Sequence, residues 1–185
     1  MKVNKKYKGL VTKKFNEFYF VELDKDETSV NNKKFLCKIK KSINFRNQFI
    51  FVGDEVIVYE IDLQRKRATI ESLVKRNNLL ERPSVANISN IYVICSVEEP
   101  KLNLSQVNKF LISAEQLGVE VSLVLTKCDL ITEEKRLLLI EKFHQWGYQA
   151  ITLNLNNPEN LRNLLIELKK KKCSILMGPS GVGKT

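Results

Sequence analysis

The first part of the chain alternates between short apolar runs and polar turns. Aromatic and β-branched residues concentrate in these runs, which favours β-strands, and the segments between them lack the period of an amphipathic helix. Lys13–Glu17 is polar and predicts a hairpin connection, and the turn Val52-Gly53-Asp54 precedes a further strand. Short strands with turn signals over about 70 residues are typical of an OB-type barrel. The predicted strands are 7–12, 18–22, 35–39, 56–59 and 68–70.

From residue 85 onward, continuous apolar runs alternate with helical periods. Ser105 is the expected N-cap of the first helix, Gly118 follows its end, and Pro158 opens the third helix. Strand–helix alternation predicts βαβ units and a parallel sheet. The predicted strands are 91–96, 119–125, 148–153 and 173–177, and the predicted helices are 105–117, 132–146 and 158–168.

A change of character around residues 74–84 separates these two patterns. The polar stretch there ends in Arg82-Pro83-Ser84, which breaks any regular element. We therefore predict an all-β barrel over 1–76, a linker over 77–84, and an α/β domain over 85–185.

Charge is distributed unequally between the two parts. The 185 residues carry a net charge of +10, of which 1–76 hold +8 and 77–185 only +2. A basic module suggests a polyanionic partner such as nucleic acid, although a lysine-rich solvated surface fits the same numbers. Aromatic side chains of the barrel are candidates for base stacking or for its core, namely Tyr7, Phe15, Phe18, Tyr19 and Phe20.

Several function classes are excluded by what the sequence does not contain. No apolar run approaches the roughly 20 residues of a membrane-spanning helix, and the basic N-terminus is followed by no apolar segment of a secretory signal. We therefore expect a cytoplasmic protein without a membrane partner. The four cysteines are widely separated, which argues against a disulfide framework and against a zinc site.

A glycine-rich segment follows the last predicted strand. It matches G-x-x-x-x-G-K-[ST] in full, in the strand context that a phosphate-binding loop requires. Its glycines let backbone N–H groups turn toward phosphates. Lys184 is the expected catalytic residue, reaching the β- and γ-phosphates, and the Thr185 hydroxyl is the expected Mg²⁺ ligand. The predicted phosphate site is Gly178, Pro179, Ser180, Gly181, Val182, Gly183, Lys184 and Thr185.

A second candidate motif, Thr126-Lys127-Cys128-Asp129, follows the strand ending at residue 125. It lies at the carboxyl edge, where α/β sheets bind ligands. A carboxylate at Asp129 can accept from the two N–H groups on the guanine edge, which adenine cannot supply, and the Lys127 stem can pack on the base. Thr126, Lys127 and Asp129 are therefore the predicted guanine site, and GTP with Mg²⁺ the predicted ligand.

The order of the two motifs is unusual, because the guanine motif precedes the phosphate loop by 49 residues. A permuted order can still build the same site where chain ends lie close together. With these motifs, and with Val52-Gly53-Asp54, Arg76–Pro83 and Ala86-Asn87-Ile88, the chain resembles the circularly permuted GTPases that assemble the small ribosomal subunit, the RsgA family.

The resemblance covers nearly the whole chain and implies a function. It implies GTP hydrolysis stimulated by the small (30S) ribosomal subunit during its late maturation, with the OB barrel on ribosomal RNA. We expect the protein to act as a monomer. Residues 152–156, where a further base-contacting segment is expected, show no clear match.

The end of the chain departs from the family pattern. The helix after the phosphate loop, the switch segments, the Asp-x-x-Gly motif and the zinc domain that the resemblance implies would all lie beyond residue 185. We therefore expect a piece of a longer protein that hydrolyses little GTP by itself, with zinc only in that further segment.

Two alternatives stay open from the residues alone. One is a P-loop ATPase or kinase with a basic RNA-binding module, against which 126–129 argues. The other is an RNA-binding module with a vestigial nucleotide site, against which the intact Lys184 and Thr185 argue.

Overall fold

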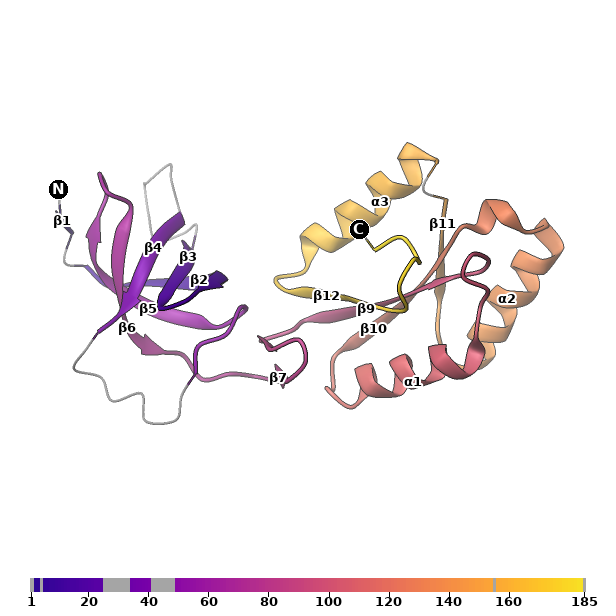
Figure 1. Cartoon of the computed structure of the whole chain (residues 1–185), viewed down its shortest axis with the longest axis horizontal. Helices are drawn as coiled ribbons and strands as arrows, with labels where there is room; N and C mark the ends of the chain where they lie inside the picture. Colours follow the sequence, from indigo (N-terminus) through magenta and orange to yellow (C-terminus); the bar gives the residue numbers. More distant parts are fainter. Residues whose placement is uncertain (1, 4, 25–33, 41–48, 155, 185) are drawn as a thin grey trace. The chain divides into compact units, whose positions relative to one another are not determined.

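The computed structural model of the chain describes residues 2–3, 5–24, 34–40, 49–154 and 156–184. The chain divides into two compact units, Met1–Asn87 and Ile88–Thr185 (Figure 1). Each unit has its own sheet and its own core, and each is described by itself below.

The first unit is a closed five-stranded barrel, as predicted. Its strand order is β2-β3-β4-β6-β5, and pairing of β5 with β2 closes it. Neighbours are antiparallel except β4 and β6. A sixth, very short strand that the sequence did not predict, β1, pairs with β5. The strands are β1 (Lys2–Val3), β2 (Tyr7–Phe15), β3 (Phe18–Leu23), β4 (Lys34–Ile39), β5 (Glu55–Asp62) and β6 (Arg67–Leu73).

The hairpin connection predicted at 13–17 is wrong in its extent. Strand β2 continues to Phe15, and only Asn16 and Glu17 form the turn, with Asn16 at φ 52°. The lysines at 13 and 14 stay in the strand because their side chains are exposed to solvent, where polar groups cost nothing.

The barrel core is built by the side chains that alternate inward. In β3, Tyr19, Val21 and Leu23 are buried, whereas Phe20 points outward and is 36% exposed. Tyr19 is therefore core and unavailable for base stacking. Phe15 is 62% exposed. The buried core cluster is Val11, Tyr19, Val21, Leu23, Phe35, Cys37, Ile50, Val56, Val58, Ile61, Ala68 and Ile70.

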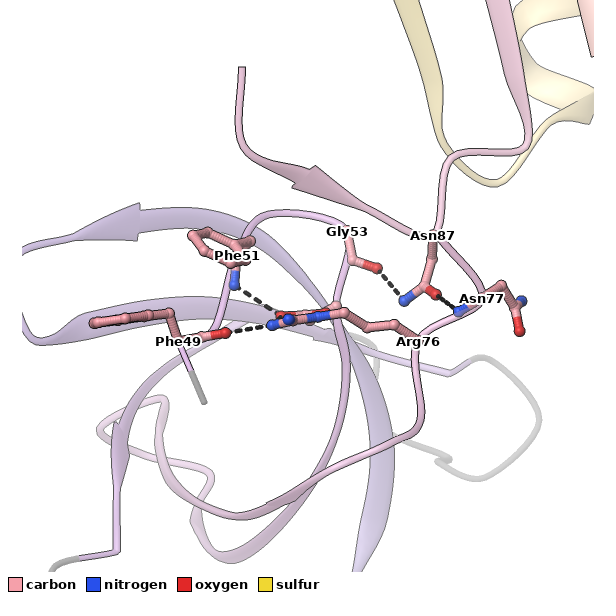
Figure 2. A network of polar contacts seen from close by, with 7 residues as sticks. Phe49, Phe51, Gly53, Arg76, Asn77 and Asn87 are labelled. Atoms are coloured by element: carbon pink, nitrogen blue, oxygen red, sulfur yellow. Dashed lines mark hydrogen bonds and ion pairs between the residues drawn. The ribbon is translucent and has the colours of Figure 1, made fainter. Parts of the chain in front are cut away.

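A buried ion pair holds the segment that leaves the barrel (Figure 2). The Arg76 guanidinium donates to both carboxylate oxygens of Asp54, at 2.6 and 2.7 Å, and Asp54 also accepts from the Phe51 N–H at 2.8 Å. Asp54 is fully buried, and Arg76 lies over the Phe51 ring and also donates to the Phe49 carbonyl. The pairing with Asp54 raises the pKa of Arg76.

The segment predicted as a linker is tied to the barrel by further hydrogen bonds. Strands β7 (Leu79–Leu80) and β8 (Val85–Ala86) form a short hairpin. Asn87 accepts from the Asn77 N–H at 2.9 Å and donates to the Gly53 carbonyl at 3.0 Å (Figure 2). Gly53 has φ 87°, and a Cβ there would lie 2.0 Å from the Ala86 carbonyl oxygen, so only glycine fits.

The second unit is a parallel four-stranded sheet flanked by helices, which confirms the predicted alternation. The strand order is β11-β10-β9-β12, with every pair parallel. Figure 1 shows α3 on one face of the sheet, and α1 and α2 on the other. The elements are β9 (Asn90–Ser96), α1 (Leu104–Glu115), β10 (Glu120–Thr126), the 3-10 turn η2 (Cys128–Leu130), α2 (Glu133–Gln145), β11 (Ala150–Leu153), α3 (Pro158–Lys170) and β12 (Ser174–Met177).

The helices begin and end close to the predicted positions. The N-cap of α1 is Asn103, whose carboxamide accepts from the Gln106 N–H at 3.1 Å, and the cap predicted at Ser105 is wrong. The helix begins at Leu104, so Ser105 lies inside its first turn and Asn103, an equally good capping residue, takes the N-cap position. Strand β9 is buried along its whole length, as the apolar run predicted.

Candidate nucleotide-binding site

Parallel pairing brings the two predicted motifs to one edge of the sheet. Strand β10 ends at Thr126 and β12 ends at Met177, and both flank β9. The register pairs Thr126 with Ser96, and Met177 with Val93. Since carboxyl ends of parallel strands share an edge, the segments 126–129 and 178–184 leave the sheet on the same side.

The glycine-rich segment forms an open loop directly after β12. Gly178 has φ 147°, and a Cβ there would lie 2.1 Å from the Ile94 carbonyl oxygen. Gly181 and Gly183 have φ 80° and 88°. Left-handed glycines turn successive N–H groups to one side, which suits an anion. The loop lines a cavity of about 640 Å³, to which Ser180 also contributes, so these residues fit a phosphate group.

Lys184 lies across this loop. Its ammonium donates to the Gly178 carbonyl at 3.0 Å and to the Pro179 carbonyl. The side chain therefore turns back over the loop instead of extending into solvent. Thr185, the predicted Mg²⁺ ligand, lies outside the described residues.

A buried hydroxyl joins the guanine motif to the phosphate loop. Thr126 is fully buried, and its Oγ1 donates to the Val182 carbonyl at 2.7 Å. Val182 is 1% exposed and packs with Tyr92, Ile94, Val124 and other apolar side chains of the sheet face that α3 covers. The buried Val182 side chain therefore anchors the phosphate loop in the apolar core, a role that the sequence analysis did not predict. The signal was a lone apolar residue between two glycines.

A third segment, 97–103 after β9, contacts both motifs and was also missed. Lys127 has a left-handed backbone (φ 57°), and its ammonium donates to the Glu99 carbonyl. An ideal Cβ on Gly181 would lie 3.6 Å from Pro100. The loop after β9 therefore contacts the guanine motif through Glu99, and its Pro100 lies next to Gly181 of the phosphate loop. Its sequence carries no recognised motif, so only the fold reveals it.

Within the guanine motif, Cys128 is half-buried and its neighbour Asp129 is exposed. The Cys128 thiol donates to the Leu125 carbonyl at 3.3 Å, and burial raises the pKa of Cys128. Asp129 is exposed in η2. The neutral thiol thus fixes the turn while the carboxylate stays available to a ligand. The register of β10 with β11 pairs Thr126 with Leu153, so Asn154 reaches the same edge beside Lys127.

Comparison with known proteins shows the family to which the chain belongs. The family model of RsgA GTPase matches residues 72–185. The chain belongs to the RsgA GTPase family. Two curated relatives, each called small ribosomal subunit biogenesis GTPase RsgA, come from Prochlorococcus marinus strain NATL1A and Parasynechococcus marenigrum strain WH8102. They are 39% and 35% identical over 97% and 96% of this chain. The chain spans about 60% of the length of these RsgA relatives.

Two solved structures share the fold of this chain. The crystal structure of YjeQ from Thermotoga maritima matches with a TM-score of 0.84 and 27% identity, over 97% of this chain and 63% of that one. The structure of YloQ, described as a circularly permuted GTPase, matches with a TM-score of 0.81 and 23% identity, over 97% of this chain and 62% of that one.

The residues that the structure describes contain neither a membrane-spanning helix nor a cluster of metal-ligating side chains. No helix there is long and apolar enough to cross a membrane. No three His, Cys, Asp or Glu side chains in that part of the chain converge as a metal centre would need.

Proposed function

We propose that this chain is the nucleotide-binding and RNA-binding part of a GTPase that acts in late maturation of the small (30S) ribosomal subunit. The observation that carries the nucleotide assignment is the Thr126–Val182 hydrogen bond at 2.7 Å, which couples the guanine motif to the phosphate loop. Membership of the RsgA family, whose curated relatives are named for small-subunit biogenesis, supports the ribosomal assignment. Such work on ribosomes belongs in the cytoplasm.

Guanine recognition in this proposal rests on Asp129. Its exposed carboxylate follows the buried end of β10 and would accept from the N1–H and amino groups of the base. Lys127, held by the Glu99 carbonyl, would lay its stem along the base face. Adenine lacks that pair of donors, so the site would select GTP over ATP.

Phosphate binding in this proposal rests on the loop 178–184. Its backbone N–H groups would cradle the phosphates, and Lys184 would exchange its bonds to the Gly178 and Pro179 carbonyls for phosphate oxygens. When bound, Mg²⁺ would neutralise charge on the β- and γ-phosphates, with Thr185 as its protein ligand. The loop's own contribution is electrostatic: it holds the γ-phosphate in place and offsets its charge.

Ribosomal RNA is the partner proposed for the barrel. Residues 1–76 carry most of the net positive charge. Lysines of this unit lie over aromatic rings on its outer surface, as Lys13 does over Phe20 and Lys38 over Phe18. Cations next to exposed rings suit a partner that has both phosphates and bases.

The decisive experiment measures GTP turnover of the full-length protein that contains this chain, with and without purified small ribosomal subunits. We expect a low intrinsic rate of GTP hydrolysis that the subunits raise strongly. ATP should be bound and hydrolysed much less than GTP. Absence of stimulation, with ATP used as well as GTP, would leave an unspecified P-loop nucleotidase.

Two substitutions test the site. Asp129→Asn should shift preference from GTP toward xanthosine triphosphate, whose carbonyl replaces the guanine amino group, and unchanged GTP affinity would remove Asp129 from the site. Lys184→Ala should abolish turnover and weaken nucleotide binding, whereas Lys169→Ala, an exposed lysine at the end of α3, should leave both unchanged.

A further inference from the structure

The outer face of the barrel holds a cleft of about 330 Å³. Strands β3, β4 and β6 supply its floor, and the end of β5 with the turn that follows it supplies one rim. Its lining combines one aromatic ring with charged side chains of both signs: Phe18, Lys38, Glu60, Asp62, Arg65 and Arg67.

Strand register explains why these side chains meet. The pairs Tyr19–Cys37 and Phe20–Leu36 of β3 and β4 place Phe18 beside Lys38 one step further along. Residues 18 and 38 alternate with the buried Tyr19 and Cys37, so both point outward. The Lys38 ammonium lies 4.7 Å from the centroid of the Phe18 ring. The Lys38 ammonium therefore covers the ring face in the cleft, and a base could stack there only by displacing it.

The cleft contains two carboxylates held by hydrogen bonds and three cations. On the rim, Glu60 accepts from the Thr69 hydroxyl at 3.1 Å, which fixes that carboxylate. Asp62 accepts from the N–H groups of Gln64 and Arg65 at 3.1 and 3.0 Å, and these bonds lower the pKa of Asp62. The cations come from three other positions, Lys38, Arg65 and Arg67.

This mixture of charges argues against a site for a bare phosphate. A bare phosphate would be attracted by the three cations but repelled by two fixed carboxylates. A nucleotide satisfies both sets: its phosphate pairs with cations, its base stacks on the ring, and amino groups on the base edge donate to carboxylates.

We propose that this cleft holds one unpaired nucleotide of a single-stranded RNA segment. The proposal rests on the proposed function, in which the barrel binds ribosomal RNA, and adds the form of RNA and the position that reads it. The base stacks on Phe18, displacing the Lys38 ammonium, which moves to the adjoining phosphate together with Arg67. Glu60 accepts from an exocyclic amino group. A base inside a duplex cannot reach the ring, because its faces are covered by its neighbours.

The test is fluorescence anisotropy on the whole 185-residue chain, with labelled single-stranded RNAs of roughly eight nucleotides, a length within the range of one OB fold. The probes are oligo(C), oligo(U) and an RNA duplex. Phe18→Ala should weaken oligo(C) binding about tenfold, in line with loss of one base stack. Phe15→Ala is the matched control, because Phe15 pairs with Phe18 across the hairpin but is not part of the cleft lining.

Two further variants keep the test independent of folding. Arg67→Ala removes an exposed cation of the cleft, and Lys34→Ala removes an exposed lysine outside it. We expect the first to weaken oligo(C) binding several-fold and to flatten its salt dependence, and the second to do neither. Oligo(C) should bind more tightly than oligo(U). Of these two bases, only cytosine has an exocyclic amino group that can donate a hydrogen bond to Glu60.

The outcomes separate this proposal from the proposed function. Equal losses for Phe18→Ala and Phe15→Ala, tighter binding of duplex than of oligo(C), or equal binding of oligo(C) and oligo(U), would overturn the cleft assignment. If the chain still bound small ribosomal subunits, the proposed function would stand. Loss of all RNA and subunit binding by the unmodified chain would overturn both.

Discussion

Removing the Arg76 guanidinium should destabilise the barrel selectively. Asp54 is 0% exposed, and Arg76 supplies two of the three hydrogen bonds described for its carboxylate, leaving only the Phe51 N–H. We choose Arg76→Met because the methionine keeps an apolar stem over the Phe51 ring. The variant then isolates the loss of the charged partner from the loss of packing.

The magnitude follows from the environment of the pair. Breaking a buried ion pair by removing one partner costs about 3–5 kcal/mol, because the other charge remains buried. The Arg76 side chain is 22% exposed, so water can partly replace it. We therefore expect a loss near the lower limit, about 3 kcal/mol. The double variant Arg76→Met/Asp54→Asn should lose less, because no unpaired charge is left in the interior.

Hydrogen exchange read by mass spectrometry can localise this effect. Amides of β5 and β6 should exchange about 150-fold faster, the factor that corresponds to about 3 kcal/mol. The urea midpoint of Trp146 fluorescence should stay unchanged, because the single tryptophan lies in the other unit. Lys34→Met is the control: it removes the exposed pair with Glu22, at 3.7 Å, which should cost under about 1 kcal/mol.

The stabilising role of the Asp54–Arg76 pair is refuted if Arg76→Met changes barrel exchange no more than Lys34→Met does. It is also refuted if the double variant with Asp54→Asn is less stable than Arg76→Met alone. In the first case the ion pair would contribute no net stability, and in the second the uncompensated charge would not be the cause of the loss.

Three other expectations concern the α/β unit. Gly178→Ala should abolish nucleotide binding in a titration, because its Cβ would lie 2.1 Å from the Ile94 carbonyl, whereas Gly118→Ala, with no atom within 4 Å, should only cost about 1–2 kcal/mol of backbone strain. Thr126→Val should weaken GTP binding about tenfold through the lost bond to the phosphate loop, and Thr126→Ser should restore it. Burial raises the pKa of Cys95 from 9.0 to about 11. The unfolded state therefore loses that proton first, and stability should fall by about 1 kcal/mol per pH unit between those values. In urea titrations at pH 8 and pH 10, Cys95→Ala should therefore lose less unfolding free energy between the two pH values than the unmodified chain. An unchanged loss would contradict this prediction.

The order of elements and both motifs could be read from the sequence, because they depend on local patterns. A continuous apolar run such as 91–96 predicts a fully buried strand, and the alternation in 18–22 predicts a strand with one inner face. The glycine spacing of 178–184 predicts a phosphate loop because only glycine accepts the backbone angles observed there. Residue type and spacing contain this information without any long-range contact.

Other features depended on contacts that no local pattern records. The segment 77–84 reads as a linker, yet the barrel holds its flanks through Asp54 with Arg76 and Gly53 with Asn87, residues 22 and 34 positions apart. The roles of Val182 and of the Glu99 carbonyl also arose only when β9 came to lie between β10 and β12. Hydrogen bonds between distant residues require the chain to be folded first. The sequence by itself therefore determined which chemistry this protein carries, and the tertiary structure decided which residues hold that chemistry in place.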